Sequence, residues 1–181
     1  MHSSTLMKTG YAPVNGLQMY YEIRGPTGVS PLVLLHGGGD TIETSFGQLL
    51  PALARDRQVI AFEQQGCGRT ADIPDRPFSF EQSADDMAAL LKHLNIERAD
   101  LLGFSNGGTI ALQAVMRYPQ LVRRLIVITA IMKRTWADAD PQFWESMTRR
   151  TWSRFFTNRE TECATSRTYR TRRFARSPHR L

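Results

Sequence analysis

A serine between two glycines, set where an apolar run meets a helix-like run, constrains the fold of this chain more than any other feature. The apolar residues 99–103 lead directly into the sequence G-F-S-N-G at 103–107, and residues 109–118 then carry apolar side chains at helical spacing. A turn this tight leaves no room for a Cβ atom at either glycine, because strand and helix approach closely there. The pattern predicts a strand, a sharp turn and a helix, with the Ser105 hydroxyl at the tip of the turn.

The chemistry of this turn favours a nucleophilic serine. The amino end of a helix carries partial positive charge, and the backbone N–H of Asn106 can donate to an anion that forms beside Ser105. The alternative is a serine that only tolerates a glycine-rich turn. A second motif favours the nucleophile: residues 32–35 form an aliphatic run that ends in His36, and three glycines follow at 37–39.

Taken together and in this order, the two motifs resemble the N-terminal part of an α/β-hydrolase, of the esterase, lipase and C–C hydrolase kind, over residues 11–144. The resemblance implies that Ser105 is the catalytic nucleophile. It also implies that the backbone N–H groups of Gly38 and Asn106, with Gly37 as a further candidate, form the oxyanion hole. Serine at this position argues against haloalkane dehalogenases and epoxide hydrolases, whose nucleophile is aspartate. The expected substrates are small molecules with an ester, lactone or related carbonyl group.

The order of the remaining elements predicts an α/β fold with a mostly parallel sheet and helices on both faces. Strands and helices alternate at the spacing of right-handed crossovers. The expected elements are a hairpin turn at 14–16, strands at 17–23, 31–35, 58–62, 99–103 and 125–129, and helices after Ser45, after Ser79 and over 106–118. Both serines fit a capping-box pattern. The ligand site of such a sheet lies at the carboxyl ends of the strands, where both motifs fall.

The segment after residue 62 resembles a third loop of the same family, D-x-R-G-x-G-x-S, with two departures: Glu63 replaces the aspartate and Gln65 replaces the arginine. A structural carboxylate that holds the loop is the favoured interpretation of Glu63, over an acid catalyst. His36 is interpreted as a residue that shapes the glycine loop. His93 is placed near the end of a helix, where a positive charge suits the helix dipole, and is given no catalytic role.

The rest of a serine–histidine–acid triad is not recognisable, so the acid and the base are unknown. The family places them after the serine, on loops that follow two further strands. The one histidine that follows Ser105 is His179, and the later acids Asp138, Asp140, Glu145, Glu160 and Glu162 have no aliphatic strand beside them. Because a serine hydroxyl without a base is a poor nucleophile, the sequence predicts a weak or inactive hydrolase. A non-catalytic pseudoenzyme or fragment is the alternative.

Charge is distributed very unevenly along the chain. Residues 149–181 contain ten arginines, no lysine and two glutamates, a net charge of +8, whereas residues 1–148 carry −2, which together give the net +6. The favoured hypothesis is a C-terminally truncated hydrolase domain at 11–148, including the start of a cap, and a disordered or frame-shifted tail at 149–181. A basic arm that binds nucleic acid or acidic lipid is the alternative. Residues 1–10 are expected to form a flexible N-terminus.

Other classes of protein are disfavoured by the sequence. No apolar run approaches the ~20 residues of a membrane span, and the N-terminus lacks the apolar core of a signal peptide, so a cytoplasmic location is expected. Cys67 and Cys163 lie far apart, which argues against a metal cluster. No metal and no cofactor are expected, and the oligomeric state is not predicted.

Overall fold

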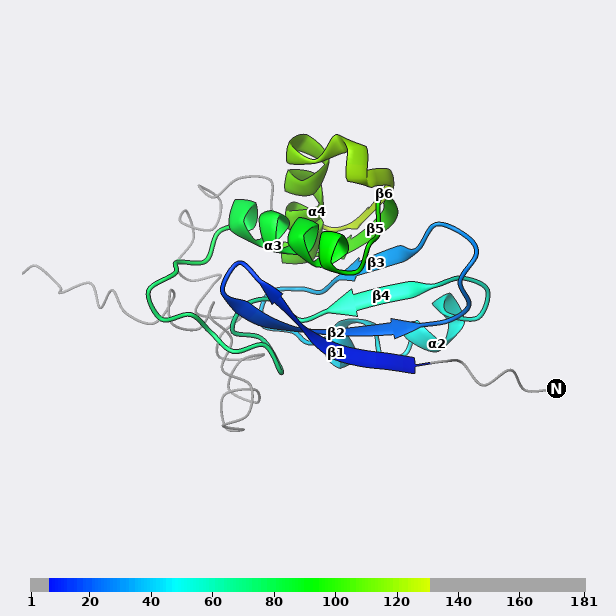
Figure 1. Cartoon of the computed structure of the whole chain (residues 1–181), viewed down its shortest axis with the longest axis horizontal. Helices are drawn as coiled ribbons and strands as arrows, with labels where there is room; N and C mark the ends of the chain where they lie inside the picture. Colours follow the sequence, from blue (N-terminus) through cyan, green and yellow to red (C-terminus); the bar gives the residue numbers. More distant parts are fainter. Residues whose placement is uncertain (1–6, 131–181) are drawn as a thin grey trace, which may run out of the picture.

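The computed structural model describes residues 7–130 of the 181-residue chain, which form a six-stranded sheet with helices on both faces (Figure 1). In chain order the elements are β1 (Met7–Val14), β2 (Leu17–Arg24), β3 (Leu32–Leu35), α1 (Ile42–Phe46), α2 (Leu50–Leu53), β4 (Val59–Phe62), α3 (Phe80–His93), β5 (Ala99–Phe104), α4 (Asn106–Arg117), the 3₁₀ turn η1 (Pro119–Leu121) and β6 (Val122–Ile128). The expected start of a cap and the arginine-rich tail lie outside the described residues.

The sheet order β1-β2-β4-β3-β5-β6 is mostly parallel, as the sequence predicts. Strands β4, β3, β5 and β6 run parallel to one another, while β1 and β2 form an antiparallel hairpin and β2 pairs antiparallel with β4. Strands β3 and β4 are buried on both faces, which explains their unbroken apolar character. Leu35 pairs with Gly103, so the parallel order brings the two glycine motifs to the same edge of the sheet.

Apolar side chains fill two cores, one on each face of the sheet. On one face α3 and α4 pack over the strands, with Leu90 and Ile110 fully buried (Figure 1). On the other face the short helices α1 and α2 contribute Phe46 and Leu50. Removing such surface from water stabilises a fold by about 25 cal/mol per Å². Core packing therefore fixes the strands and helices that carry the two glycine motifs, at 36–39 and 103–107.

The sequence predicts no bounds for the strand before the hairpin turn, and β1 includes part of the segment expected to be flexible. Residues 7–10 belong to the segment 1–10 that was expected to be flexible, yet they pair with residues 21–24 of β2. Backbone pairing orders this polar segment although it contributes few apolar side chains. The predicted hairpin turn is confirmed, because Asn15 and Gly16 both have positive φ, 49° and 87°, as a two-residue turn of this kind requires.

The helix expected after Ser45 begins earlier and is divided in two. Thr41 is the N-cap of α1 and forms a capping box with Thr44: the Thr44 N–H donates to Thr41 Oγ1 at 3.2 Å, and the Thr41 N–H donates to Thr44 Oγ1 at 2.8 Å. The predicted cap at Ser45 is wrong, because the Ser45 hydroxyl bonds to the glycine loop instead. The predicted cap of α3 is confirmed, since Ser79 Oγ accepts from the Gln82 N–H at 3.0 Å.

Strand β6 forms one edge of the described sheet. The aliphatic run at 125–129 predicts a buried strand, but Ile126 is 50% exposed and Ile128 is 44% exposed. The prediction of burial is wrong because β6 pairs with β5 alone among the described strands. Arg123 links β6 to β5, since its guanidinium donates two hydrogen bonds to the Asp100 carboxylate at 2.7 and 2.6 Å.

Candidate active site

Ser105 occupies a strained turn at the carboxyl end of β5. Its backbone has φ 52° and ψ −118°, and residues other than glycine rarely adopt such a positive φ. The Ser105 N–H donates to the Ile128 carbonyl in β6 at 3.0 Å, and the Ser105 carbonyl accepts from the Gly108 N–H at 2.9 Å. The residue remains partly exposed. Strand β6 and helix α4 thus hold the serine in a conformation that its own preferences disfavour.

Two glycines make this turn sterically possible, as the sequence predicts. A Cβ atom on Gly103 would lie 2.6 Å from the carbonyl carbon of Gly107 and 2.7 Å from Cα of Gly108. A Cβ atom on Gly107 would lie 2.5 Å from the carbonyl carbon of Leu35 on the neighbouring strand. These contacts are with backbone atoms, which cannot move aside as the end of a flexible side chain can. Both positions therefore require glycine.

The glycine loop that follows β3 lies beside this turn. Gly38 is so close to Asn106 that a Cβ atom on Gly38 would collide with the side-chain amide of Asn106. Within residues 7–130 the backbone N–H groups of Gly38 and Asn106 donate to no acceptor. The Gly37 N–H differs, because it donates to Ser45 Oγ at 3.2 Å. Two unpaired backbone donors, one from each motif, therefore lie on neighbouring segments.

His36 shapes the glycine loop from within the core. The ring is buried; Nε2 accepts from the backbone N–H of Gln64 at 3.0 Å, and Nδ1 lies 2.8 Å from the Gly37 carbonyl. Because Nε2 accepts, the proton of the neutral ring lies on Nδ1 and is donated to Gly37. Burial lowers the pKa of His36 below its ordinary value of 6.5, although the bond to Gly37 acts in the opposite direction. These contacts agree with the loop-shaping interpretation of His36.

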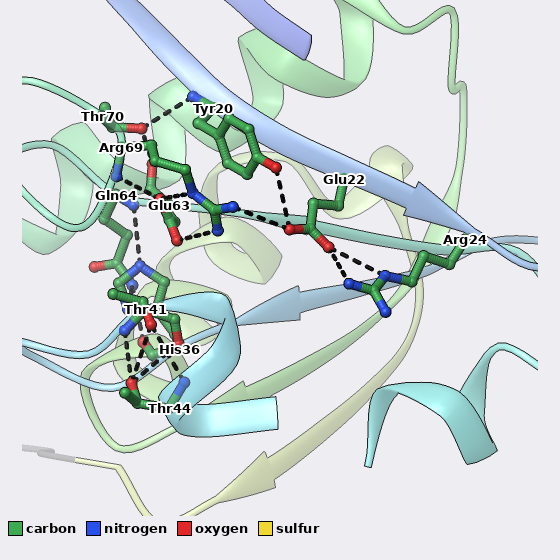
Figure 2. Close-up of polar contacts among 10 residues, drawn as sticks. All are labelled: Tyr20, Glu22, Arg24, His36, Thr41, Thr44, Glu63, Gln64, Arg69 and Thr70. Carbon is green, nitrogen blue, oxygen red and sulfur yellow. Dashed lines mark hydrogen bonds and ion pairs between the residues drawn. The ribbon is translucent and has the colours of Figure 1, made fainter. Parts of the chain in front are cut away.

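An ion-pair cluster holds the loop that follows β4 (Figure 2). The Arg69 guanidinium donates to Glu63 Oε1 at 2.7 Å and to Oε2 at 3.0 Å, and the Arg69 backbone N–H donates to Oε2 at 2.5 Å. The same guanidinium lies 3.7 Å from the centre of the Tyr20 ring and 3.3 Å from Glu22. Glu63 is 1% exposed, and its carboxylate is fully engaged by this loop. The contacts agree with the structural interpretation of Glu63.

No hydrogen bond within residues 7–130 joins the Ser105 hydroxyl to a base. Residues 7–130 include two of the four histidines, His36 and His93. Both ring nitrogens of His36 are engaged, and His93 is the last residue of α3. His179 and the acids at 138, 140, 145, 160 and 162 lie outside the described residues. The geometry of the triad partners therefore stays a prediction.

The described range contains neither a metal-binding cluster nor a membrane-spanning helix. No group of three His, Cys, Asp or Glu side chains in residues 7–130 could hold a metal ion. No helix in that part of the chain is long and apolar enough to cross a membrane.

Sequence reasoning missed three residues that support the glycine loop. Ser45 Oγ accepts from the Gly37 N–H and donates to Asp40 Oδ2 at 2.8 Å. The Gln64 side-chain amide donates to the His36 carbonyl at 2.8 Å. The sequence carries a signal for Ser45, but it is ambiguous, because a serine just before an apolar helical run also fits an N-cap.

Comparisons with known proteins agree with this arrangement. A family model described as alpha/beta hydrolase fold matches residues 30–181. The chain is 37% identical over 100 residues to a 2-hydroxymuconate semialdehyde hydrolase of Pseudomonas sp. strain CF600, a match that covers 54% of the chain and 35% of the relative. It is 34% identical over 127 residues to the Homo sapiens protein named serine hydrolase BPHL, covering 68% of the chain and 43% of the relative.

A solved structure shows the same similarity in three dimensions. The epoxide hydrolase CorEH superposes with a TM-score of 0.64 at 30% sequence identity, covering 70% of this chain and 43% of that one. The chain spans less than half of the length of each of these three proteins. Because the family model matches most of the chain and the described sheet has the expected order, the chain belongs to the α/β-hydrolase family.

Proposed function

We propose that this chain carries the nucleophile and the oxyanion hole of a serine hydrolase that acts on an ester, lactone or related carbonyl compound. The observation that carries the proposal is the strained backbone of Ser105 beside the N–H groups of Gly38 and Asn106, which donate to no acceptor within residues 7–130. Backbone strain at a single, partly exposed serine, maintained by two neighbouring elements, is typical of a functional site. The relatives with hydrolase names support the same reaction class.

In the proposed reaction, Ser105 Oγ attacks the carbonyl carbon of the substrate. As the new C–O bond forms, the carbonyl electron pair moves to oxygen and the hydroxyl proton passes to a base. The negative oxygen accepts hydrogen bonds from the Gly38 and Asn106 N–H groups, reinforced by the amino end of α4. Collapse expels the leaving alcohol with the proton from the base. Water then hydrolyses the acyl-serine by the same route.

Gly37 has no part in binding the proposed oxyanion. The sequence resemblance includes Gly37 as a further donor, but its N–H is already bonded to Ser45 in this structure. No base and no acid are assigned, because no hydrogen bond within residues 7–130 joins such a group to the Ser105 hydroxyl. We therefore propose that the chain on its own turns substrate over weakly or not at all.

A second candidate function is binding of a carbonyl ligand without turnover. The lack of a base beside Ser105 among the described residues favours it, because an oxyanion hole and a pocket alone give only modest catalysis. The two candidates differ in whether Ser105 can be acylated when a base is supplied from solution.

The test is acetylation of Ser105 by p-nitrophenyl acetate, with and without added imidazole as the external base. Peptide mass spectrometry should find the acetyl group on the Ser105 peptide when imidazole is present. The Ser79 peptide is the matched control, because that hydroxyl is occupied as a helix cap. Acetyl groups spread evenly over surface serines, or none on Ser105, would leave the non-catalytic candidate as the better account.

A further inference from the structure

We propose that Ser45 and Asp40 are positioning residues that aim the oxyanion hole: together they hold the glycine loop so that the Gly38 N–H, and not the Gly37 N–H, faces the substrate. This inference rests on the proposed function, because it concerns the donor that the reaction would use. It assigns a task to two side chains that lie outside both glycine motifs.

The first step is the hydrogen bond that occupies the Gly37 N–H. Ser45 Oγ accepts this N–H at 3.2 Å, and the Ser45 hydroxyl donates its own proton to Asp40 Oδ2 at 2.8 Å. Because the carboxylate can only accept, the direction of both bonds is fixed. The serine oxygen keeps its lone pair toward the loop and its proton toward Asp40. The Gly37 N–H is thereby removed from the set of donors that a substrate can use.

The second step concerns the carbonyl of the same residue. The Gly37 carbonyl accepts from His36 Nδ1 at 2.8 Å and from the Asp40 N–H at 3.2 Å. This carbonyl and the Gly38 N–H belong to one trans, planar peptide unit, in which they point in opposite directions. Two donors that hold the carbonyl on one side therefore direct the Gly38 N–H to the other side. Asp40 contributes to this through its backbone and to the first step through its side chain.

The third step is the attachment of Ser45 to the core through helix α1. Ser45 lies on α1, whose Ile42 and Phe46 side chains are buried in the core on that face of the sheet. The Ser45 N–H donates to the Thr41 carbonyl at 3.2 Å within the same helix. A short helix fixed by its apolar face thus presents one hydroxyl to the glycine loop. The loop itself has no side chains at 37–39 with which to hold its own orientation.

A purely structural role for Ser45 would make a different prediction. If the hydroxyl only stabilised α1, its removal would lower stability and leave the orientation of the Gly37–Gly38 peptide unchanged. Thr44 provides the matched control, because it is the neighbouring hydroxyl on α1 and bonds to Thr41 rather than to the loop. The variants Ser45→Ala and Thr44→Ala each remove one hydroxyl from the same helix.

The experiment measures two quantities in the full chain: the imidazole-dependent rate of Ser105 acetylation, and the exchange rates and chemical shifts of the Gly37 and Gly38 amides by NMR. Ser45→Ala should slow acetylation by about ten-fold or more, since a misdirected oxyanion donor loses much of its effect. It should also speed exchange of the Gly37 amide and shift the Gly38 resonance. Ser45→Thr, which keeps the hydroxyl, should restore both, and Thr44→Ala should resemble the unmodified chain.

Several results would overturn the proposal. Unchanged acetylation in Ser45→Ala would do so, and so would an equal loss in Thr44→Ala. If Ser45→Ala fails to fold, Asp40→Ala tests the same interaction, because it removes the carboxylate that accepts from the Ser45 hydroxyl. Asp40→Ala should slow acetylation to the same extent. If the unmodified chain shows no acetylation of Ser105, the proposed function fails, and the amide measurements decide the positioning claim. Gly37 and Gly38 amides that are unaffected by Ser45→Ala would then reject it.

Discussion

Individual residues set the geometry at the carboxyl edge of this sheet. The glycines do so because they have no Cβ atom. Gly103 and Gly107 have no space for a Cβ atom because backbone from α4 and β3 occupies it. Ser105 has a side chain, and it is held at positive φ by bonds to Ile128 and Gly108. The serine and its flanking glycines are therefore a single steric unit, which is why the motif could be interpreted from sequence.

Gly107→Ala tests this steric argument. Its Cβ atom would meet the backbone of β3, which cannot yield without disturbing the sheet, so we expect a loss of more than about 2 kcal/mol in the free energy of unfolding. Gly10→Ala is the control, because its Cβ atom would meet the hydroxyl and ring of the Tyr21 side chain rather than backbone atoms. Urea titrations of both variants give the comparison. Equal stabilities would show that the turn has more room than the structure indicates.

His36 makes stability depend on pH. Its folded pKa lies below 6.5 because of burial, so between 6.5 and the folded pKa the unfolded chain binds a proton that the folded chain does not. Stability is therefore fully present above pH 6.5 and falls as the pH decreases, by up to about 1.4 kcal/mol per pH unit for one group. Urea titrations across this range should show the slope. His36→Asn should reduce it and His93→Asn should keep it; the reverse order would refute the assignment.

Turns, helix caps and helices could be predicted where residues close together in the sequence determine them. The Asn15-Gly16 turn, the Ser79 cap and the helix predicted over 106–118 were all found, the last as α4 at Asn106–Arg117. Ser45 was misassigned because its partner, Gly37, comes from another segment and no local pattern reveals it. The burial of β6 was also mispredicted, because an aliphatic run does not show whether a strand has one neighbour or two.

The exposed edge at β6 should make the chain associate. Ile126, Val127 and Ile128 are between a third and a half exposed on a strand whose outer backbone groups have no partner strand among the described residues. Such an edge favours pairing between chains. Light scattering and sedimentation should show oligomers or precipitate, which Ile126→Lys with Ile128→Lys should reduce. A stable monomer with a cooperative thermal transition would contradict this expectation.

At the level of the whole chain, two features matter most: the chain matches only part of the length of its relatives, and its charge is unevenly distributed along the sequence. The chain spans less than half of the length of the three proteins described above, and its net charge of +6 arises from residues 149–181. The family match reaches residue 181, which the hypothesis of a shifted reading frame does not predict. The sequence could single out Ser105 as the proposed nucleophile and residues 36–39 as the proposed oxyanion loop, because both belong to local motifs. It could not locate the base, which the family supplies from a distant segment.

The arginine-rich tail gives a prediction about nucleic acid. We expect weak, non-selective binding that disappears near physiological salt, as for any arginine-rich peptide, and that is lost when residues 149–181 are removed. Affinities for duplex DNA should be measured over a range of salt concentrations. A true nucleic-acid arm would instead bind selectively, with a log–log salt slope of about −0.9 per phosphate contacted. Reading the coding DNA in all three frames beyond codon 148 tests the frame hypothesis independently.

Turnover of p-nitrophenyl acetate by the unmodified chain and by Ser105→Ala, with and without imidazole, tests whether the described domain supplies a nucleophile and an oxyanion hole but no base. Without imidazole the two proteins should hydrolyse the ester at the same rate. With imidazole the unmodified chain should be faster than Ser105→Ala, whose rate measures the reaction of imidazole itself. Strong serine-dependent turnover without imidazole, abolished by His179→Ala, would contradict this account and identify His179 as the base.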